Sequence, residues 1–456
     1  MLHSIARIVE QFKQEWSQEL SDEAIEKAIR KTGMTWRDRK LNPITTVQLF
    51  FLQILHGNVA CNFLPHLARR RFTGSAYCEA RGKLPLEALE TLLTGATAKM
   101  ADCVRDAGRW LGHRLFLADG SSFSMSDTEE LREHFGTPTG QREGCGFPTA
   151  SWLALVHFGS GLFQKVVAGP LRQHDLSGVP QIHPELTPGD VLLGDRAFCS
   201  FAHLGLLILA GIHGIFRAHQ KLIIDFTPGR AHFISKGAKR RAKKSNPQAL
   251  PRSRWIAGLG PMDQIVEWFR PAERPGWMPA ETFAALPATL RVRELRYQVA
   301  RPGFRVREVT LVTTLLDAQK YTAADLAAAY GLRWTVETNF AHLKTTMKMD
   351  VLHCKTVPGV LKELTMFLLV YNLVRMVMLE AARRQEVPVE RISFVDALRW
   401  LATARPGDEL PELVINPARR GRAEPRVRKR RPKQFPLMRQ PRHVLRNALL
   451  QQEVTA

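Results

Sequence analysis

Residues 330–344 read YGLRWTVETNFAHLK, a sequence typical of a helix that also carries four chemically demanding side chains. The four polar residues are Tyr330, Arg333, Glu337 and Lys344. Because an α-helix turns about 100° per residue, all four fall within an arc of about 60°. Lys348 comes five turns after Tyr330 and extends the same face. Apolar packing surface is expected from the remaining large side chains, Trp334, Val336, Phe340 and Leu343.

This polar face has two interpretations. Arg333 and Glu337 form an ordinary i,i+4 pair if the face is solvated, which stabilises the helix by a few tenths of a kcal/mol. Alternatively, Glu337 holds a metal ion beside a phosphodiester, with neighbouring cations on the phosphates. The first interpretation is favoured for the stretch alone, and the second requires further carboxylates elsewhere in the chain.

The composition favours a polyanionic partner. The chain has 456 residues, 65 Lys and Arg against 43 Asp and Glu, a net charge of +22 and a pI near 10.2. Nucleic acid is therefore the first candidate. A basic protein on a membrane surface is the competitor, but no long amphipathic basic helix with an aromatic face supports it.

The sequence indicates no zinc site, disulfide framework, secretory signal or membrane span. The six cysteines show no C-x-x-C spacing, so neither a zinc site nor a disulfide framework is expected. The opening residues have early charges and no continuous apolar segment, unlike a secretory signal. The apolar run 366–379 contains Arg375 and is too short to span a bilayer, which predicts a core helix and an intracellular protein.

Two aspartates follow short apolar runs. The segment RLFLADGSSFSMSD (114–127) predicts a buried strand that ends at Asp119, and residues 191–193 predict another that ends at Asp195. Between them, residues 151–170 predict a hairpin with the turn Gly159-Ser160-Gly161. Either aspartate alone is more typical of a turn or cap. Together with Glu337, however, they form three carboxylates that need a divalent cation, and hard oxygen ligands suit Mg²⁺ or Mn²⁺.

The chain divides into five predicted regions. They are a helical N-terminal domain with probable DNA binding (1–110), the first part of an α/β core (111–216), an inserted mostly β subdomain (217–310), the second part of the core (311–385), and a helical and basic C-terminal region (386–456). Basic residues gather at Arg69, Arg70, Arg71, Arg81 and Lys83, at 236–244, and in the tail 419–433. For the N-terminal cluster, DNA binding and a solvated basic face are equally supported.

With these residues in place, the chain resembles the DDE transposases of the insertion-sequence-four family. Their signature is Tyr, two residues, Arg, three residues, Glu, six residues, Lys, which the four polar residues of 330–344 match without a gap. LADGSSF (117–123) matches the block of the first catalytic aspartate, and GDRAFCS (194–200) resembles that of the second. AYCEARGKLP (76–85) is also similar, so the resemblance covers most of residues 70–385.

The resemblance implies an α/β fold with a ribonuclease H-like catalytic core, interrupted by a β-rich insertion, with a helical N-terminal domain and a basic C-terminal tail. It implies a cut-and-paste transposase that binds the terminal inverted repeats of its element. Asp119, Asp195 and Glu337 would be catalytic and ligate two Mg²⁺ ions, with Mn²⁺ as a substitute. The implied contacts to double-stranded DNA are Tyr330, Arg333, Lys344, Lys348 and Trp334.

Further expectations follow from the same resemblance. The protein would be cytoplasmic and nucleoid-associated, without a membrane, and a homodimer in the synaptic complex. In related enzymes an aromatic residue of the insertion stacks on a flipped base. Trp255, Trp268 and Trp277 are the candidates here, although core packing is favoured for any one of them. His342 is assigned to packing or to the flank of the face, not to catalysis.

Two rival functions remain. A structure-specific nuclease on the same fold would cut DNA without joining it. A repurposed relative that only binds DNA would act without catalysis, although the presence of all three carboxylates argues against it.

Overall fold

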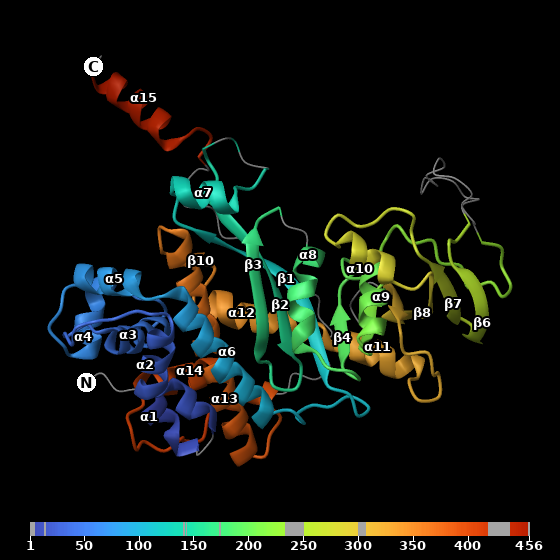
Figure 1. The fold of residues 1–456 in the computed structure, drawn as a ribbon, viewed down its shortest axis with the longest axis horizontal. Coiled ribbons are helices and arrows are strands. Elements are labelled where there is room, and N and C mark those ends of the chain that lie inside the picture. Colours follow the sequence, from blue (N-terminus) through green and yellow to red (C-terminus); the bar gives the residue numbers. More distant parts are fainter. Residues whose placement is uncertain are drawn as a thin grey trace.

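The computed structural model describes residues 5–12, 15–139, 142, 144–172, 175–232, 250–299, 307–417 and 438–454 (Figure 1). The helices are α1 (Ile5–Val9), α2 (Asp22–Lys31), α3 (Pro43–Leu55), α4 (Leu64–Ala68), α5 (Gly74–Lys83), α6 (Leu86–Cys103), α7 (Glu129–Phe135), α8 (Asp175–Ile182), α9 (Phe201–Leu209), α10 (Ala280–Ala285), α11 (Ala323–Leu332), α12 (Trp334–Ala341), α13 (Val357–Arg384), α14 (Phe394–Thr403) and α15 (Arg442–Val454). The predictions for the basic stretches 236–244 and 419–433 concern residues outside the described part.

The strands carry the central layer of the molecule. They are β1 (Leu115–Met125), β2 (Thr149–His157), β3 (Phe163–Pro170), β4 (Val191–Gly194), β5 (His213–Arg217), β6 (Arg254–Gly260), β7 (Asp263–Phe269), β8 (Thr289–Val299), β9 (Arg307–Thr313) and β10 (Val351–Leu352). The described strands form one sheet in the order β3-β2-β1-β4-β5-β9-β8-β7-β6, and β10 pairs with β1. The fold is therefore mixed α/β with a large sheet at its centre.

The described residues from 5 to 103 form helices joined by turns, and local signals set their ends. Ser21 caps α2 as predicted, because its hydroxyl accepts a hydrogen bond from the backbone N–H of Ala24 at 3.1 Å. Gly33 follows the end of this helix with φ of +79°, a left-handed conformation that glycine adopts without strain. Figure 1 shows these helices on one side of the sheet, beside α13 and α14.

Strand β1 is longer than the sequence predicts. It does not end at Asp119 but continues through Gly-Ser-Ser-Phe-Ser to Met125. The reason is its pairing with β2, which runs without a break from Phe116↔His157 to Ser124↔Thr149. The ladder satisfies the backbone groups of a polar stretch that carries no strand signal of its own.

The predicted hairpin is present and is fixed to a core helix. β2 and β3 pair antiparallel across the turn 158–162, where Gly161 has φ of +71°. The guanidinium of Arg375, on α13, donates to the backbone oxygen of Ser160 at 2.8 Å. A Cβ on Gly161 would lie 2.5 Å from that guanidinium, so the turn requires glycine for space as well as for conformation.

The strands of the predicted insertion belong to the same sheet as the core. β9 pairs with β5 antiparallel through Phe216↔Val312, and β8, β7 and β6 follow outward. The return of the last strand to the core, predicted from 309–315, is thus achieved by direct pairing. The mostly β character is also observed, and α10 is the helix described within this part.

Helix α13 forms the centre of the larger hydrophobic core. Its 28 residues are long and apolar enough to cross a membrane by length and composition, but 89% of its most apolar window is buried inside the protein. This is how the core helix of a folded domain behaves, in agreement with the core helix predicted at 366–379. Helix α15 stands away from the body of the molecule (Figure 1).

The two faces of β1 point into different cores. Leu115, Leu117 and Phe123 pack in the cluster that includes α6, α12 and α13, whereas Phe116 and Ala118 pack in the cluster with α8 and α9. Because side chains alternate along a strand, Asp119 and Ser121 face α12 and Ser122 faces the opposite side.

Candidate active site at the ends of the parallel strands

The two predicted aspartates lie side by side because of strand register. Within the parallel strands, Ala118 on β1 is aligned with Gly194 on β4, and Gly194 with Phe216 on β5. The next residues along these strands are Asp119, Asp195 and Arg217, so all three lie at the same edge. Arg217 was not singled out from the sequence. Its signal there is only its place after the apolar run of a third strand.

The loop after β4 is held by its own side chains. A carboxylate oxygen of Asp195 accepts a hydrogen bond from the backbone N–H of Ala197 at 2.7 Å. Phe198 is fully buried, and its backbone oxygen bonds Nδ1 of the buried His203 at 2.8 Å. The position of Asp195 is thus set by a short turn that is anchored in the core.

The segment with Tyr330, Arg333, Glu337 and Lys344 is helical, but it is not one regular helix. α11 begins after a capping box between Thr322 and Asp325, as the predicted cap at Thr322 requires. The helical assignment is interrupted at Arg333, resumes as α12, and ends in a π-helix, His342–Thr346. Such π-helical turns are frequent at functional sites.

Lys348 departs from the predicted face. The helix has ended before this residue, which has φ of +68°, and its exposed side chain runs past Gly57 of the N-terminal helices. The helical periodicity fails there because the π-helix and the turn after it change the direction of the chain. The placement of Lys348 on the face of Tyr330 is therefore wrong.

Arg333 joins two of the three carboxylates. Its NH1 donates to Oδ2 of Asp119 at 2.8 Å, and its NH2 lies 3.5 Å from Oε1 of Glu337. Its buried Nε has no acceptor among the residues that the structure describes. The contact with Asp119 on the sheet is thus shorter than the i,i+4 contact with Glu337, so the face is not merely a solvated one.

The electrostatics of the site are perturbed in the direction expected for crowded acids. Burial raises the pKa of Asp119 to about 6; Arg333 and the N–H of Gly120 act against this rise, and the charges of Asp195 and Glu337 add to it. Burial likewise raises the pKa of Tyr330, which is 9% exposed. Perturbed groups of this kind are concentrated at functional sites.

Lys344 reaches the same strand as Asp119. Its Nζ donates to Oγ of Ser121 at 3.1 Å, and burial lowers its pKa. Ser121 was not identified from the sequence. The signal available was its spacing of two residues from Asp119, which places both side chains on one face of the strand.

The aromatic residues near the site differ from expectation in one case. Trp334 is 62% exposed, so the predicted packing role is wrong, and the guanidinium carbon of Arg333 lies 5.4 Å from the centre of its ring. His342 packs as predicted: it stacks on Phe394 with 4.3 Å between ring centres, and burial lowers its pKa to about 4.

The insertion tryptophans have mainly structural surroundings. Trp268 is buried and its Nε1 donates to Oε1 of Glu294 at 3.0 Å, which is a core role. Trp277 packs against the smaller of the two sheet cores. Trp255 is half-buried on β6, at the edge of the sheet.

The carboxylates of Asp119, Asp195 and Glu337 offer the hard oxygen ligands that a divalent cation such as Mg²⁺ prefers. In the present arrangement, however, Arg333 lies between Asp119 and Glu337. Among the described residues, no group of three or more His, Cys, Asp or Glu side chains is close enough to hold a metal ion. Glu337 is 47% exposed, which leaves its side chain free to turn.

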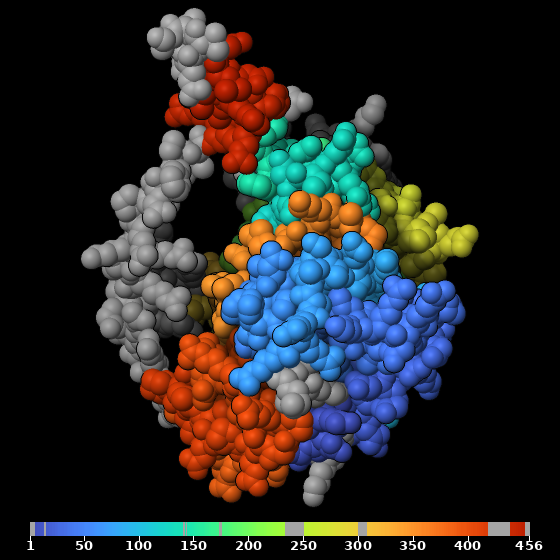
Figure 2. Space-filling view, turned by 90° about the vertical axis from the view of Figure 1, so that its left-hand side faces the viewer, coloured from blue at the N-terminus to red at the C-terminus, as the bar shows by residue number. Residues whose placement is uncertain are grey.

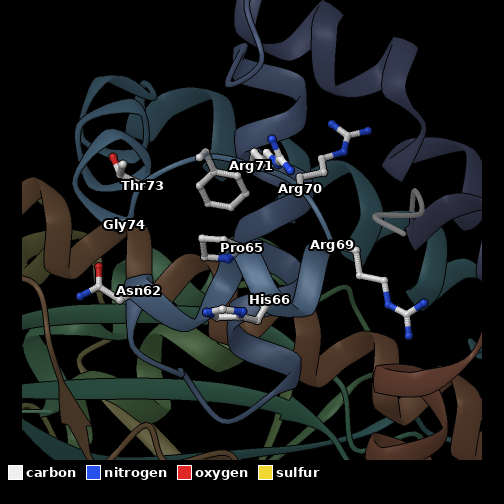
Figure 3. Close-up of a pocket in the computed structure, with 9 residues that line it drawn as sticks. Asn62, Pro65, His66, Arg69, Arg70, Arg71, Thr73 and Gly74 are labelled. Carbon is white, nitrogen blue, oxygen red and sulfur yellow. The ribbon is translucent and has the colours of Figure 1, made fainter.

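A second basic region lies on the N-terminal helices. An open pocket of about 830 Å³ lies between α4 and α5, and Figure 3 shows Arg69, Arg70 and Arg71 along the segment that connects them. All three are exposed, and none forms an ion pair within the part of the chain that the structure describes. On the face shown in Figure 2, these helices, in blue, are bordered by orange residues of the C-terminal half.

Arg81, which the sequence groups with these arginines, is bonded inside the protein. It donates to Oε1 of Gln53 at 2.9 Å and to Sγ of Cys354 at 3.3 Å. It therefore links α5 to the segment after β10 and is not a free cation. The prediction of Arg81 as part of an exposed basic face is wrong.

Comparison with known proteins agrees with the sequence resemblance. The family described as Transposase DDE domain matches residues 110–373, more than half of the chain. The transposase InsG for insertion sequence element IS4 of Escherichia coli is 26% identical over 386 residues, which cover 79% of this chain and 78% of that protein. A piggyBac transposase in a synaptic complex with hairpin DNA has 9% identity and a TM-score of 0.45 over 88% of this chain and 80% of that one, a likeness too weak to establish a shared fold.

Proposed function

Because the chain belongs to the DDE transposases, and among them to the insertion-sequence-four family, we propose that it binds the terminal inverted repeats of an insertion sequence and moves the element by a cut-and-paste route. It is a DNA transposase by family. The proposal concerns the route, the DNA ends and the residues that act on them.

The register of the parallel strands carries this proposal. It brings Asp119 and Asp195 to adjacent positions, and Arg333 connects Asp119 with Glu337. A mixed sheet with two carboxylates on neighbouring parallel strands and a third on the helix packed above supports a ribonuclease H-like core. Burial is the main cause of the raised pKa of Asp119, and the smaller contributions of Asp195 and Glu337 to it support the convergence of all three carboxylates.

We assign metal binding to Asp119, Asp195 and Glu337, with two Mg²⁺ ions as the physiological choice and Mn²⁺ as a substitute. DDE transposase domains generally use divalent ions. When bound, such ions activate a water or a 3′-hydroxyl and stabilise the leaving oxygen of an in-line displacement at phosphorus. The protein's part is to bring the three carboxylates together and to place the DNA strand beside them.

The cationic side chains around the carboxylates would hold that strand. The NH1 and NH2 groups of Arg333 each contact one carboxylate oxygen, and the contact to Glu337 is 3.5 Å long, so the guanidinium has donors left for a phosphate. Tyr330 and Lys344 flank it on the same segment, and the exposed ring of Trp334 offers a surface for a base. Lys348, which lies toward the N-terminal helices, would contact DNA outside the cleavage point.

The arginine pocket supports DNA binding by the N-terminal helices. Three exposed guanidinium groups that have no acidic partner within the described ranges lie next to the first turn of α5, and they suit the phosphate backbone. Substituting Arg70 with Ala should weaken binding to all DNA sequences and reduce its salt dependence. Arg30→Ala is the matched control, because Arg30 is already paired with Glu26; an equal loss there would mean that only net charge matters.

The chemistry is tested by divalent-dependent cleavage of DNA that carries the element's own ends, taken from the flanks of the coding sequence. Glu337→Gln should fold and bind the ends but not cleave. Hairpin-ended products would support the cut-and-paste route, and absence of a joined product with a pre-cut end would favour the nuclease. Binding without cleavage by the wild type would favour the repurposed DNA-binding protein.

Two further proposals follow from the function. Two element ends in one complex require two active sites, so we expect a homodimer in the synaptic complex, which light scattering with and without end DNA would check. We also expect the protein to be cytoplasmic and associated with the nucleoid, without a membrane. Fluorescence microscopy of a tagged chain would test that location.

A further inference from the structure

One face of β1 is bonded at two points to the segment that carries the family signature. Asp119 accepts from Arg333 at 2.8 Å, and two residues further along, Ser121 accepts from Lys344 at 3.1 Å. Side chains two residues apart on a strand point the same way and are separated by roughly 6.8 Å. The two cations, eleven residues apart in sequence, are thus bonded to neighbouring positions on one strand.

Lys344 needs such a contact more than Arg333 does. A lysine ammonium is a point charge on a flexible four-carbon stem, whereas the guanidinium of Arg333 is planar and already held by two carboxylates. Lys344 forms no ion pair with any described residue, and the bond to Ser121 uses one of its three donors. The remaining donors are available to a ligand.

We propose that Ser121 is a positioning residue, which holds the Lys344 ammonium next to Asp119 so that Arg333 and Lys344 contact different phosphates of one DNA strand. This inference rests on the proposed function, since the ligand is the DNA strand at the carboxylates. Ser121 does not touch the reacting atoms; it acts through Lys344. Ser121 faces the site because it lies two residues after Asp119 on β1, so both side chains point to the same face of the strand.

The strand offers a matched control. Ser122 is the next residue and is also half-buried, but it lies on the opposite face, on the side of the core with α8 and α9. Ser121→Ala and Ser122→Ala remove the same atom from the same strand. Ser121→Thr keeps the hydroxyl, and its β-branched side chain suits a strand.

The test measures acylation of Lys344 by mass spectrometry in the full chain, with and without duplex DNA that carries the element end. DNA should slow the labelling of Lys344 at least about tenfold in the wild type, in Ser122→Ala and in Ser121→Thr, since a hydrogen bond to a charged group is worth about that factor. In Ser121→Ala the slowing should fall to about twofold or less. Thermal unfolding of each variant confirms that it is folded.

A second readout separates positioning from general damage. Ser121→Ala should keep the salt dependence of end binding, because Lys344 retains its charge, but lose single-turnover cleavage about tenfold, because a misplaced group costs rate. Equal protection of Lys344 in Ser121→Ala and wild type, or no protection in the wild type, would overturn the inference. Protection in a wild type that fails to cleave would overturn the proposed function and leave the inference standing.

Discussion

Two Arg–Asp pairs, one buried and one half-buried, have opposite characters. On the inserted strands, Arg293 binds Asp263 through two donors, Nε at 2.7 Å and NH2 at 2.5 Å, and its NH1 donates to the backbone oxygen of Tyr321 at 2.6 Å. At the candidate site, Arg333 reaches Asp119 through one donor only, its Nε has no acceptor within the described part of the chain, and its second contact is 3.5 Å long.

The difference separates a pair with a structural role from a pair that is a candidate for ligand binding. All three nitrogens of the Arg293 guanidinium donate hydrogen bonds within the protein, so this pair offers no donor to a ligand. The same bonds join β7 and β8 to the start of α11. Arg333 and Asp119 are incompletely satisfied and lie beside two more carboxylates. Incomplete bonding in a crowded acidic site is costly for the fold and useful for binding.

The largest expected effect is on the site pair. Asp119→Asn should reduce cleavage by at least about 10³-fold, as removal of a central catalytic group does. The folded-state pKa of about 6 lies above the ordinary 3.8, so ionisation of Asp119 destabilises the fold above pH 6 and does not below pH 3.8. At pH 7 the substitution should therefore stabilise the protein by about 1–3 kcal/mol in urea unfolding. A destabilised Asp119→Asn would make this pair structural.

The structural pair should respond in the opposite way. Asp263→Ala leaves the guanidinium of Arg293, which is 1% exposed, without a counter-ion. The free energy of unfolding should therefore fall by about 3–5 kcal/mol. Urea denaturation measures this, and Asp263→Asn, which keeps an acceptor, should lose less. If the folded Asp263→Ala protein lost less than about 1 kcal/mol, the distinction between the two pairs would fail.

The tryptophans of the two regions extend the comparison. Trp334→Ala should weaken binding of end DNA about tenfold through loss of stacking, with stability within about 0.5 kcal/mol of wild type, because the ring is exposed. Trp268→Phe should do the reverse: it removes the donor to Oε1 of the buried Glu294, whose Oε2 keeps its bond to Gln264, so stability should fall by about 1–3 kcal/mol while DNA binding is retained. A filter-binding assay and thermal unfolding separate the two.

The smallest effect concerns pH. A carboxylate must be deprotonated to bind a cation, so Mn²⁺ affinity of the DNA-free protein should fall about tenfold per pH unit below pH 6. Arg333 lowers the pKa of Asp119, so Arg333→Gln should move this midpoint upward. Asp119→Asn should remove the dependence from this pH range. Electron paramagnetic resonance of Mn²⁺ measures the affinity, and an unmoved midpoint in Arg333→Gln would contradict the coupling.

Local sequence signals predicted many elements well. The caps at Ser21 and Thr322, the turn Gly159-Ser160-Gly161 and the core helix at 366–379 depend on residues close together in the chain. The two aspartates were found because an aspartate after an apolar run is a recognisable pattern, and Glu337 was found on the polar face of a helix. Such signals report periodicity and hydrogen bonds within a few residues.

The errors have two causes. The end of β1, the exposure of Trp334 and the internal bonds of Arg81 depend on how segments that are distant in sequence pack. The departure of Lys348 from the helix face has a local cause. A helical wheel assumes a constant 100° per residue, which the π-helix at 342–346 breaks.

The sequence by itself determined the α/β character, the carboxylates and cations available for chemistry, and the family signature in 330–344. Only the tertiary structure decided that β4 aligns with β1 so that Asp119 meets Asp195, that Arg333 lies between two carboxylates, and that Ser121 receives Lys344. The physical reason is that propensity and capping act along the chain, whereas strand register and side-chain burial are set by packing between segments that are distant in sequence.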